Sequence, residues 1–295
     1  MQIVLYSKIL KEVDIPYVQQ VLDLLQEKGV NVYVYKPYLQ EMQGRIRFNR
    51  DVGIFEGFVD FRVKKIDLVI SLGGDGTILG AVTMVRDSGV PILGINLGRL
   101  GFLASIEKSR IELAVDAIIS GRVYQERRSL IYLESNLPLF GETPFALNDV
   151  TILKRDTSSM ITIHAYVNGD YLNTYWADGI IVSTPTGSTG YSLSCGGPIV
   201  FPNSGNFVIT PVAPHNLNVR PIVISDSSVV SFEIEGRAES FLCTLDSRFE
   251  TITAAHRLAV RRCDFTVSIL QIDESSFQQT IRTKLTWGID TRNHG

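Results

Sequence analysis

The sequence predicts an α/β domain followed by an all-β domain, with a C-terminal segment that packs back on the first. Three observations lead to this expectation: strand–helix alternation over the first 122 residues, short runs rich in Val, Ile, Thr and Tyr over 123–272, and a helical period near the C-terminus. Repeated strand–helix–strand units form a parallel sheet with right-handed crossovers. We therefore expect a Rossmann-like domain over 1–122, joined by 273–295, and a β-rich, sandwich-like domain over 123–272.

The spacing of apolar residues indicates the elements of the first domain. The fully apolar run Ile66–Leu72 is typical of a buried parallel strand. Asp14 is a candidate N-cap for a helix that Gly29 ends. The stretch Lys36–Lys65 shows no clear period. Strands are predicted at Gln2–Tyr6, Val30–Tyr35, Ile66–Leu72 and Pro91–Leu97, and helices at 14–28, Thr77–Asp87 and Arg110–Ser120.

The second domain is predicted from alternating patterns and one strong turn. Asn168-Gly169 between two such runs is a two-residue hairpin signal. Strands are predicted at Ser129–Glu134, Asn148–Lys154, Met160–Val167, Tyr171–Trp176, Val229–Glu235, Phe241–Leu245, Arg248–Thr253, Arg257–Arg261 and Phe265–Ile272. A final helix is predicted at Ser275–Leu285.

Composition excludes several classes of protein. The chain has 295 residues, of which 45% are hydrophobic, and a formal net charge of -3, so its bulk charge gives no reason to expect a nucleic-acid partner. Its three cysteines form no CxxC pair, which suits a reducing cytosol. No apolar run approaches the ~20 residues that span a bilayer, and the N-terminus lacks the features of a signal peptide. We expect a cytoplasmic protein that binds neither nucleic acid nor membrane.

The sharpest local feature is the Gly-rich turn Gly73–Thr77 between a predicted strand and a predicted helix. Glycines let the backbone approach a phosphate, and a helix N-terminus offers unpaired N–H groups. The turn is neither a Walker A loop nor a full G-x-G-x-x-G motif. Asp75 inside it is the informative residue, because a carboxylate would repel phosphate unless it accepts a hydroxyl proton or holds a divalent ion. The alternative is that Asp75 or Thr77 merely caps the helix.

A second feature is the absence of charge from Gly179 to Val219. Within it, Ser183–Ser194 collects hydroxyls and small residues, which suit a polyhydroxylated ligand such as a nucleoside. A neutral loop between strands is the alternative, and we favour the ligand surface because loops usually carry charge.

Asn148-Asp149 precedes an apolar run and could hold the vicinal diol of a ribose, although a turn is the simpler reading. Asp178, just ahead of the charge-free tract, is equally ambiguous. The four histidines are scattered without the spacing of metal ligands, so we expect no protein-built metal centre.

These pieces, in this order, resemble the NAD kinase family. The Gly73–Thr77 segment is shared with diacylglycerol and sphingosine kinases, whereas the long Thr184–Pro198 segment is similar to NAD kinases specifically. The resemblance spans most of the chain from about Ile66 onward. The matching segments are Gly73–Thr77, Leu93–Leu103, Leu147–Asp149, Asp178-Gly179, Ser183–Pro198, Pro214–Leu217, Arg220-Pro221 and Lys284–Gly288.

The resemblance implies transfer of the γ-phosphoryl group of ATP to the 2′-hydroxyl of the adenosine ribose of NAD, which gives NADP. It also implies a divalent cation, usually Mg²⁺, and a homo-oligomer, either dimer or tetramer, in which the β domains help to complete the site. Carried over by position, Asp75 is the base at the 2′-hydroxyl. The implied binding residues are Gly73, Gly74, Gly76 and Thr77 near phosphate, Phe102 at adenosine, Asn148 and Asp149 at ribose or adenine, and Asp178, Thr189, Gly190, Tyr191 and Ser194 at the remaining nucleoside.

Two other functions share parts of this pattern. A lipid kinase of the diacylglycerol or sphingosine type would use the same Gly-rich turn, but the sequence lacks an amphipathic basic surface. A non-catalytic dinucleotide sensor would gain nothing from Asp75. The sequence leaves open NADH against NAD as acceptor, polyphosphate against ATP as donor, feedback regulation, and whether Arg248 contacts a ligand.

Overall fold

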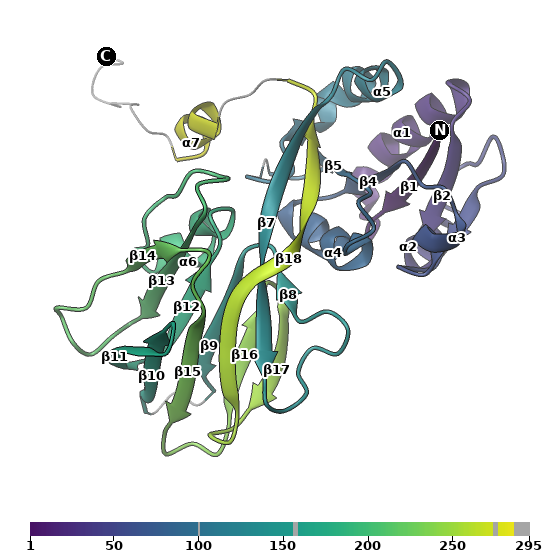
Figure 1. Cartoon of the computed structure of the whole chain (residues 1–295). Coiled ribbons are helices and arrows are strands. Elements are labelled where there is room, and N and C mark those ends of the chain that lie inside the picture. The colour runs from purple at the N-terminus through teal and green to yellow at the C-terminus, as the bar shows by residue number, and fades with distance from the viewer. Residues whose placement is uncertain (100, 156–158, 274–276, 286–295) are drawn as a thin grey trace, which may run out of the picture. The chain divides into compact units, whose positions relative to one another are not determined.

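The computed structural model describes residues 1–99, 101–155, 159–273 and 277–285 (Figure 1). The chain forms two compact units. Unit 1 comprises residues 1–127 and the stretch from Val267 onward, and unit 2 comprises Arg128–Thr266. The unit boundaries fall within strands β7 (Tyr124–Ser135) and β18 (Arg257–Gln271), a few residues from the expected 122/123 and 272/273.

Unit 1 is built on a parallel sheet with the strand order β3-β2-β1-β4-β5. Beyond β5 the end of β18 and the short β6 add further parallel pairs. This is the 3-2-1-4-5 order of doubly wound dinucleotide-binding folds, in which ligands bind beyond the carboxyl ends of the strands where the order reverses. Here the order reverses between β1 and β4. The strands are β1 Gln2–Tyr6, β2 Asn31–Tyr35, β3 Gly53–Phe55, β4 Leu68–Leu72, β5 Ile92–Asn96 and β6 Ile106–Glu107.

Helices on the sheet complete the core of unit 1. Buried residues of α1 and α5, such as Leu22 and Val115, pack in one cluster with Leu5 and Ile70 of the sheet. α4 packs on β5, because a Cβ at Gly94 would lie 2.4 Å from Ile78 Cδ1. The helices are α1 Ile15–Glu27, α2 Lys36–Met42, α3 Asp60–Val63, α4 Asp75–Val85, α5 Ile111–Ile119 and α7 Phe277–Leu285, with short 3-10 turns at Glu12–Asp14 and Lys108–Arg110.

Unit 2 is a sandwich of antiparallel strands. One sheet has the order β14-β13-β12-β9-β16-β17, and β11, β10, β15 and β18 pair in the other. Inward residues of both sheets, including Ile163, Phe232, Ile180 and Phe207, form a single core. The elements are β8 Phe145–Ala146, β9 Asp149–Lys154, β10 Ile161–Val167, β11 Asp170–Ala177, β12 Gly179–Ser183, the 3-10 turn Gly187–Thr189, α6 Tyr191–Ser194, β13 Asn206–Val212, β14 Ile222–Ser225, β15 Val230–Glu235, β16 Phe241–Leu245 and β17 Arg248–Ile252.

The expected α/β plus all-β fold class is confirmed, with differences in detail. The Asn168-Gly169 hairpin is present, with φ of +54° and +89° as a type I′ turn requires. The two strands expected at 257–261 and 265–272 are one continuous β18. The charge-free tract contains two strands that the sequence analysis missed, β12 and β13. Of the expected C-terminal helix, Ser275 and Ser276 lie outside the described residues.

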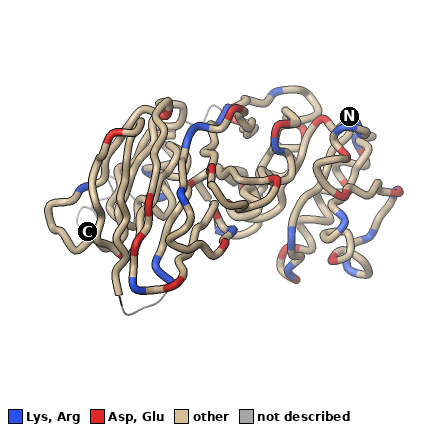
Figure 2. Tube along the Cα trace, turned by 60° about the horizontal axis from the view of Figure 1, so that its bottom comes forward, with Lys and Arg blue, Asp and Glu red and all other residues tan. Residues whose placement is uncertain are grey.

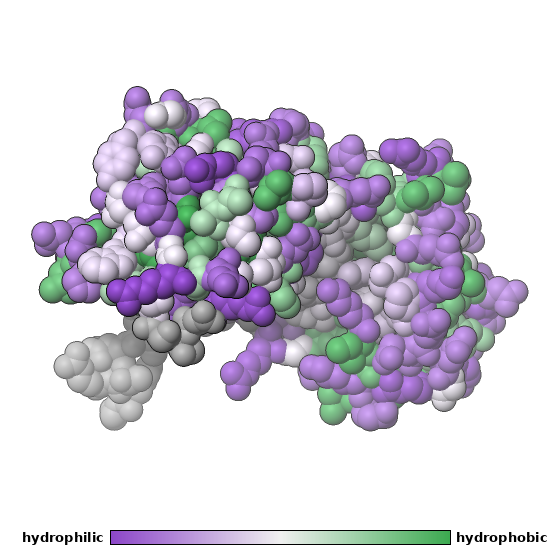
Figure 3. Space-filling model, turned by 90° about the horizontal axis from the view of Figure 1, so that it is seen from below, coloured by the Kyte–Doolittle hydropathy of each residue, from purple (hydrophilic) through white to green (hydrophobic). Residues whose placement is uncertain are grey.

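The surface carries no dominant charge. Figure 2 shows Lys and Arg interspersed with Asp and Glu along the trace. On the face shown in Figure 3, hydrophobic residues lie among hydrophilic ones. None of the described helices is long and apolar enough to cross a membrane.

Candidate functional site

The Gly-rich turn lies where the strand order of unit 1 reverses. The fully buried β4 leads into Gly73, and α4 begins at Asp75. Gly73 has φ +154°, and a Cβ there would lie 2.2 Å from Thr77 Oγ1, so only glycine fits. The turn thereby opens the N-terminus of α4 toward the crevice in which such folds bind nucleotides.

The Asp75 carboxylate does not cap its own helix. It accepts backbone N–H groups from the next loop: Oδ2 accepts from Phe102 at 2.7 Å, and Oδ1 accepts from Leu103 at 3.0 Å and Ala104 at 2.9 Å. The N-cap of α4 is Gly74, without a side-chain cap bond. The capping interpretation of Asp75 is therefore wrong, and the carboxylate instead joins the Gly-rich turn to the loop 101–104.

Close approach of that loop depends on Gly101, because a Cβ there would lie only 1.8 Å from Asp75 Oδ1. Asn96, at the end of β5, holds the same segment from the other side. Its Nδ2 donates to the carbonyl oxygens of Arg99 at 2.7 Å and Ala104 at 3.3 Å, and its Oδ1 accepts from Gly98 N–H at 2.7 Å. Asn96 was not singled out as a site residue, although a buried amide ending an apolar strand is a signal.

A cavity of about 550 Å³ lies beside the Gly-rich turn. Three cations, Lys8, Lys11 and Arg99, line it together with Gly73, Gly74, Gly76 and Thr77. The Lys8 Cε lies 3.1 Å from the position of a Cβ on Gly80, so its stem runs against α4. Cations around a helix N-terminus form a phosphate-binding arrangement. The sequence analysis missed all three of these basic residues.

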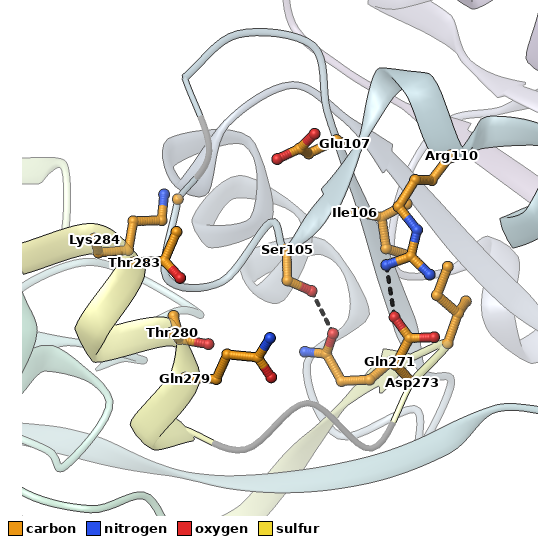
Figure 4. Close-up of a pocket in the computed structure, with 12 residues that line it drawn as sticks. Ser105, Ile106, Glu107, Arg110, Gln271, Asp273, Gln279, Thr280, Thr283 and Lys284 are labelled. Carbon is orange, nitrogen blue, oxygen red and sulfur yellow. Dashed lines mark hydrogen bonds and ion pairs between the residues drawn. The ribbon is translucent and has the colours of Figure 1, made fainter. Parts of the chain in front are cut away.

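A second cavity of about 510 Å³ lies on unit 1, with Gly101 in its wall (Figure 4). It is lined by Ser105, Ile106, Glu107 and Arg110, by Gln271–Asp273 at the end of β18, and by α7. Ser105 donates to Gln271 Oε1, and Arg110 pairs with Asp273 at 2.6 Å. Lys284 of α7 completes the lining, with its Nζ 6.0 Å from the centre of the half-buried Phe102 ring.

In unit 2 a second carboxylate gathers three consecutive backbone N–H groups. Asp246 accepts from Leu147 at 3.0 Å, Asn148 at 2.7 Å and Asp149 at 3.3 Å, and its own N–H donates to Asp149 O at 3.1 Å. Asp246 has φ +54° in the turn that joins β16 to β17. This reciprocal set of bonds fixes the backbone of the Asn148-Asp149 pair.

Asp149 itself is an unusual acid. It is 6% exposed, and its Oδ1 accepts the Thr151 hydroxyl at 3.1 Å. Burial, reinforced by the nearby Asp246 and opposed by the Thr151 bond, raises the pKa of Asp149 to about 7. Near neutral pH this side chain can thus either donate or accept a hydrogen bond to a ligand hydroxyl.

The neutral segment packs directly on this pair. Thr184 donates from Oγ1 to Leu147 O at 2.6 Å and from its N–H to Asn148 O at 2.8 Å. A Cβ at Gly187 would lie 2.1 Å from Asn148 O, and one at Gly190 would lie 4.0 Å from Asn148 Nδ2. The short turns after Gly187 carry the remaining expected residues: Thr189 is half-buried, and Tyr191 and Ser194 are exposed.

Asp178 lies at the opposite end of the β9–β12 pair from Asp149, but both carboxylates act on Tyr191, where they add to burial and Cys195 in raising the pKa of that hydroxyl. β12 pairs with β9 so that Ser183 lies opposite Asp149 and Gly179 lies opposite Leu153. Asp178, just before β12, therefore lies at the other end of the strand pair, roughly 15 Å from Asp149 at the usual rise per residue. It forms an ion pair with Lys154 at 2.6 Å.

The Arg248 side chain binds main-chain oxygens of its own unit. Its guanidinium donates to Thr143 O at 2.6 Å and Thr143 Oγ1 at 2.8 Å and to Phe145 O, and it lies near the rings of Phe140 and Phe145. Within the described part of the chain, no group of three or more His, Cys, Asp or Glu residues could hold a metal ion.

Comparison with known proteins agrees over nearly the whole chain. The family model described as the ATP-NAD kinase N-terminal domain matches residues 3–123, and the ATP-NAD kinase C-terminal domain matches 147–272. An NAD kinase of Cytophaga hutchinsonii is 47% identical over 290 residues, covering 98% of this chain and 99% of that protein. An NAD kinase of Bacteroides fragilis is 42% identical over 269 residues, covering 91% and 92%.

Solved structures share the fold. Yeast NADH kinase complexed with NADH has a TM-score of 0.89 at 23% identity, covering 100% of this chain and 90% of that one. An NAD kinase from Archaeoglobus fulgidus in complex with ATP has a TM-score of 0.75 at 23% identity, covering 97% and 99%.

Proposed function

The chain belongs to the ATP-NAD kinase family, and on that premise we propose how its residues transfer the γ-phosphoryl group of ATP to the 2′-hydroxyl of the adenosine ribose of NAD. The 2′-oxygen forms the new bond to the γ-phosphorus, the bond from that phosphorus to the β,γ-bridging oxygen breaks, and ADP leaves. The hydroxyl proton goes to the catalytic base, and NADP is the product.

Asp75 is the base, and its geometry is the observation that carries the proposal. Three backbone N–H groups hold its carboxylate at the head of α4, two on Oδ1 and one on Oδ2, which leaves about one lone-pair position on Oδ2 to accept the 2′-hydroxyl proton. Phosphoryl transfer has a loose transition state, so the carboxylate contributes through position and late proton acceptance.

The donor phosphates bind in the 550 Å³ cavity. Lys8, Lys11 and Arg99 supply positive charge, and the turn Gly73–Thr77 supplies backbone approach at the N-terminus of α4. A structural relative solved with ATP supports a nucleotide donor in this fold.

The proposed nucleoside contacts are Phe102 in unit 1, at adenosine, and a separate set of residues in unit 2. Asn148 and the buried Asp149 hold ribose or adenine, since one offers an amide and the other exchanges donor and acceptor roles near neutral pH. The neutral residues Thr189, Gly190, Tyr191 and Ser194 surround the remaining nucleoside without repelling the dinucleotide's phosphates. We also propose that Asp178 contacts the nucleoside, since its charge acts on the neighbouring proposed contact Tyr191.

A divalent cation, Mg²⁺, accompanies the donor. Mg²⁺ usually keeps several waters and binds through one or two carboxylates plus substrate phosphates, so a chain without a dedicated ligand cluster among its described residues fits it. Asp75 is the only carboxylate in the turn, and its three N–H bonds and its role as base leave it no position for the ion, so the donor phosphates and water would hold Mg²⁺. When bound, the ion neutralises charge that develops on the phosphates.

We further propose a cytoplasmic homo-oligomer, a dimer or tetramer. The three free cysteines suit a reducing compartment. Size-exclusion chromatography with light scattering tests the assembly, and a monomer at working concentration would contradict it.

The first experiment measures NADP formation from NAD, ATP and Mg²⁺ with a coupled NADP-specific dehydrogenase. Wild type should turn over, and Asp75→Asn should lose about 10²- to 10⁴-fold in kcat while still binding NAD. The matched control is Asp87→Asn, an exposed acid two residues beyond α4, which should keep full activity. Near-normal kcat in folded Asp75→Asn removes the base role, and a wild type that binds NAD without turnover favours a sensor.

A further inference from the structure

One face of α7 lines the 510 Å³ cavity. Gln279 and Thr283 are four residues apart, as are Thr280 and Lys284, and this spacing places side chains on one side of a helix. Figure 4 shows Gln279 extending from α7 toward Gln271, whereas the Lys284 side chain extends in a different direction. α7 thus contributes two hydroxyls, one amide and one ammonium group to the lining, and Glu107, Arg110 and Asp273 add charged groups to it.

The two cations of this cavity differ in their partners. Arg110 is neutralised by Asp273 at 2.6 Å. Lys284, on the other side of the cavity in Figure 4, makes no hydrogen bond or ion pair to any described residue, although it is only partly exposed. Desolvation lowers the pKa of Lys284, and Asp75 and Glu107 act on it in the opposite sense from beyond ion-pair distance. A partly desolvated ammonium that forms no close ion pair among the described residues is an arrangement that an anionic group would complete.

Lys284 also lies beside the loop that holds the catalytic acid. Gly101 is in the wall of the same cavity. The next residue, Phe102, donates its N–H to Asp75, and the centre of its ring lies 6.0 Å from the Lys284 Nζ. We propose that Lys284 is a phosphate-binding residue on the acceptor side, where it pairs with the phosphoryl group that the reaction places on the ribose 2′-oxygen. This inference rests on the proposed function and adds to it a cation from the C-terminal helix.

The competing explanation is that Lys284 only stabilises α7, because a basic residue in the last turn interacts favourably with the helix dipole. Arg282 stands in the same last turn but is exposed and does not line the cavity. Arg282→Gln therefore removes an equivalent charge from the helix end without touching the proposed subsite, which makes it the matched control for Lys284→Gln.

The test is isothermal titration of NAD and of NADP into the full-length wild type, Lys284→Gln, Lys284→Arg and Arg282→Gln. Lys284→Gln should weaken NADP binding about tenfold, the loss expected of one charge-assisted contact, and leave NAD binding within about twofold. Lys284→Arg should restore part of the NADP affinity, and Arg282→Gln should change neither ligand. The kcat of Lys284→Gln should fall by a similar factor with KM for NAD unchanged.

Equal NADP affinity in Lys284→Gln and wild type overturns the proposal, as does an equal loss for NAD and NADP or an equal effect of Arg282→Gln. Wild-type turnover in the same preparation tests the proposed function separately. An active wild type with a NADP affinity that is independent of Lys284 rejects the subsite and leaves the kinase assignment in place.

Discussion

At the scale of single residues, this molecule uses carboxylates to fix loops as well as to do chemistry. Asp75 and Asp246 each accept three consecutive backbone N–H groups, 102–104 in one case and 147–149 in the other. The first carboxylate is the proposed base, whereas the second positions the proposed ligand contacts at Asn148 and Asp149. Burial keeps a proton on Asp149 at a higher pH than usual, and the nearby Asp246 adds to that effect.

The raised pKa of Asp149 makes stability depend on pH. The folded chain keeps the Asp149 proton up to a pKa of about 7, whereas the unfolded chain releases it near 3.8, so this group's contribution to stability falls as pH rises from about 3.8 and is lost once pH has passed about 7. Asp149→Asn removes that dependence. The free energy of unfolding of Asp149→Asn minus that of wild type should increase by about 2–3 kcal/mol between pH 5 and pH 8.

Urea unfolding at pH 5, 6, 7 and 8 measures this difference. Asp170→Asn, an exposed acid in the same unit, is the control and should show the same pH dependence as wild type. A constant difference between Asp149→Asn and wild type across the range would show that Asp149 is already ionised at pH 5.

Site residues could be predicted from the sequence only where the residues that act together are neighbours in one segment of the chain. Asp75 in its Gly-rich turn and the Asn148-Asp149 pair were found this way. Lys8, Asn96, Asp246 and Lys284 were missed as site residues, because their roles depend on backbone groups or cavities supplied by distant parts of the chain. Because the donor is a main-chain N–H group, the type of the donor residue does not reveal such a hydrogen bond.

At the scale of elements, the site depends on a loop that approaches a carboxylate without side-chain bulk. Gly101→Ala would place a methyl group 1.8 Å from Asp75 Oδ1, so either the loop or the carboxylate must move. A displacement of about 1 Å at a catalytic group can cost 10²-fold in rate. We expect Gly101→Ala to lose at least about tenfold in kcat.

The matched control is Gly57→Ala, since Gly57 is outside the site and a Cβ there meets nothing within 4 Å. Both substitutions reduce the entropy of the unfolded chain equally, so only the contact with Asp75 separates them. Steady-state kinetics and circular dichroism on both variants provide the measurement. Wild-type kcat in Gly101→Ala would mean that Asp75 can move without loss and is not a precisely placed base.

Elements with a clear period were predictable, and those shaped by their neighbours were not. The Ile66–Leu72 run and the Asn168-Gly169 hairpin were confirmed because apolar content and turn chemistry are local. β18 is one strand because pairing with β15 near one end and β5 near the other carries it through the polar Arg262 and Asp264. β12 and β13 were missed because Gly, Ser and Thr conceal the strand pattern of the charge-free tract.

At the scale of the whole molecule, two separate cores carry two kinds of recognition. Unit 1 has the strand order that creates a phosphate-binding crevice at its reversal point, and unit 2 has a neutral surface around a buried acid. Strand–helix alternation was sufficient to predict the first architecture. The sandwich was predictable only as a class, because the pairing of antiparallel strands is decided by contacts distant in sequence.

A thermal-stability measurement should therefore distinguish the residues needed for dinucleotide binding from those needed for catalysis. A ligand that binds only the folded chain stabilises it by about 2.7 kcal/mol at 100 times its Kd, which raises Tm by several degrees in a protein of this size. NAD should give this shift in wild type and equally in Asp75→Asn, because the acid acts on the reacting hydroxyl and contributes little to holding the dinucleotide. Differential scanning fluorimetry across an NAD series provides the measurement. Loss of the shift in Asp75→Asn, with an unchanged Tm in the absence of ligand, would make Asp75 a binding residue and its missing turnover a consequence of lost affinity.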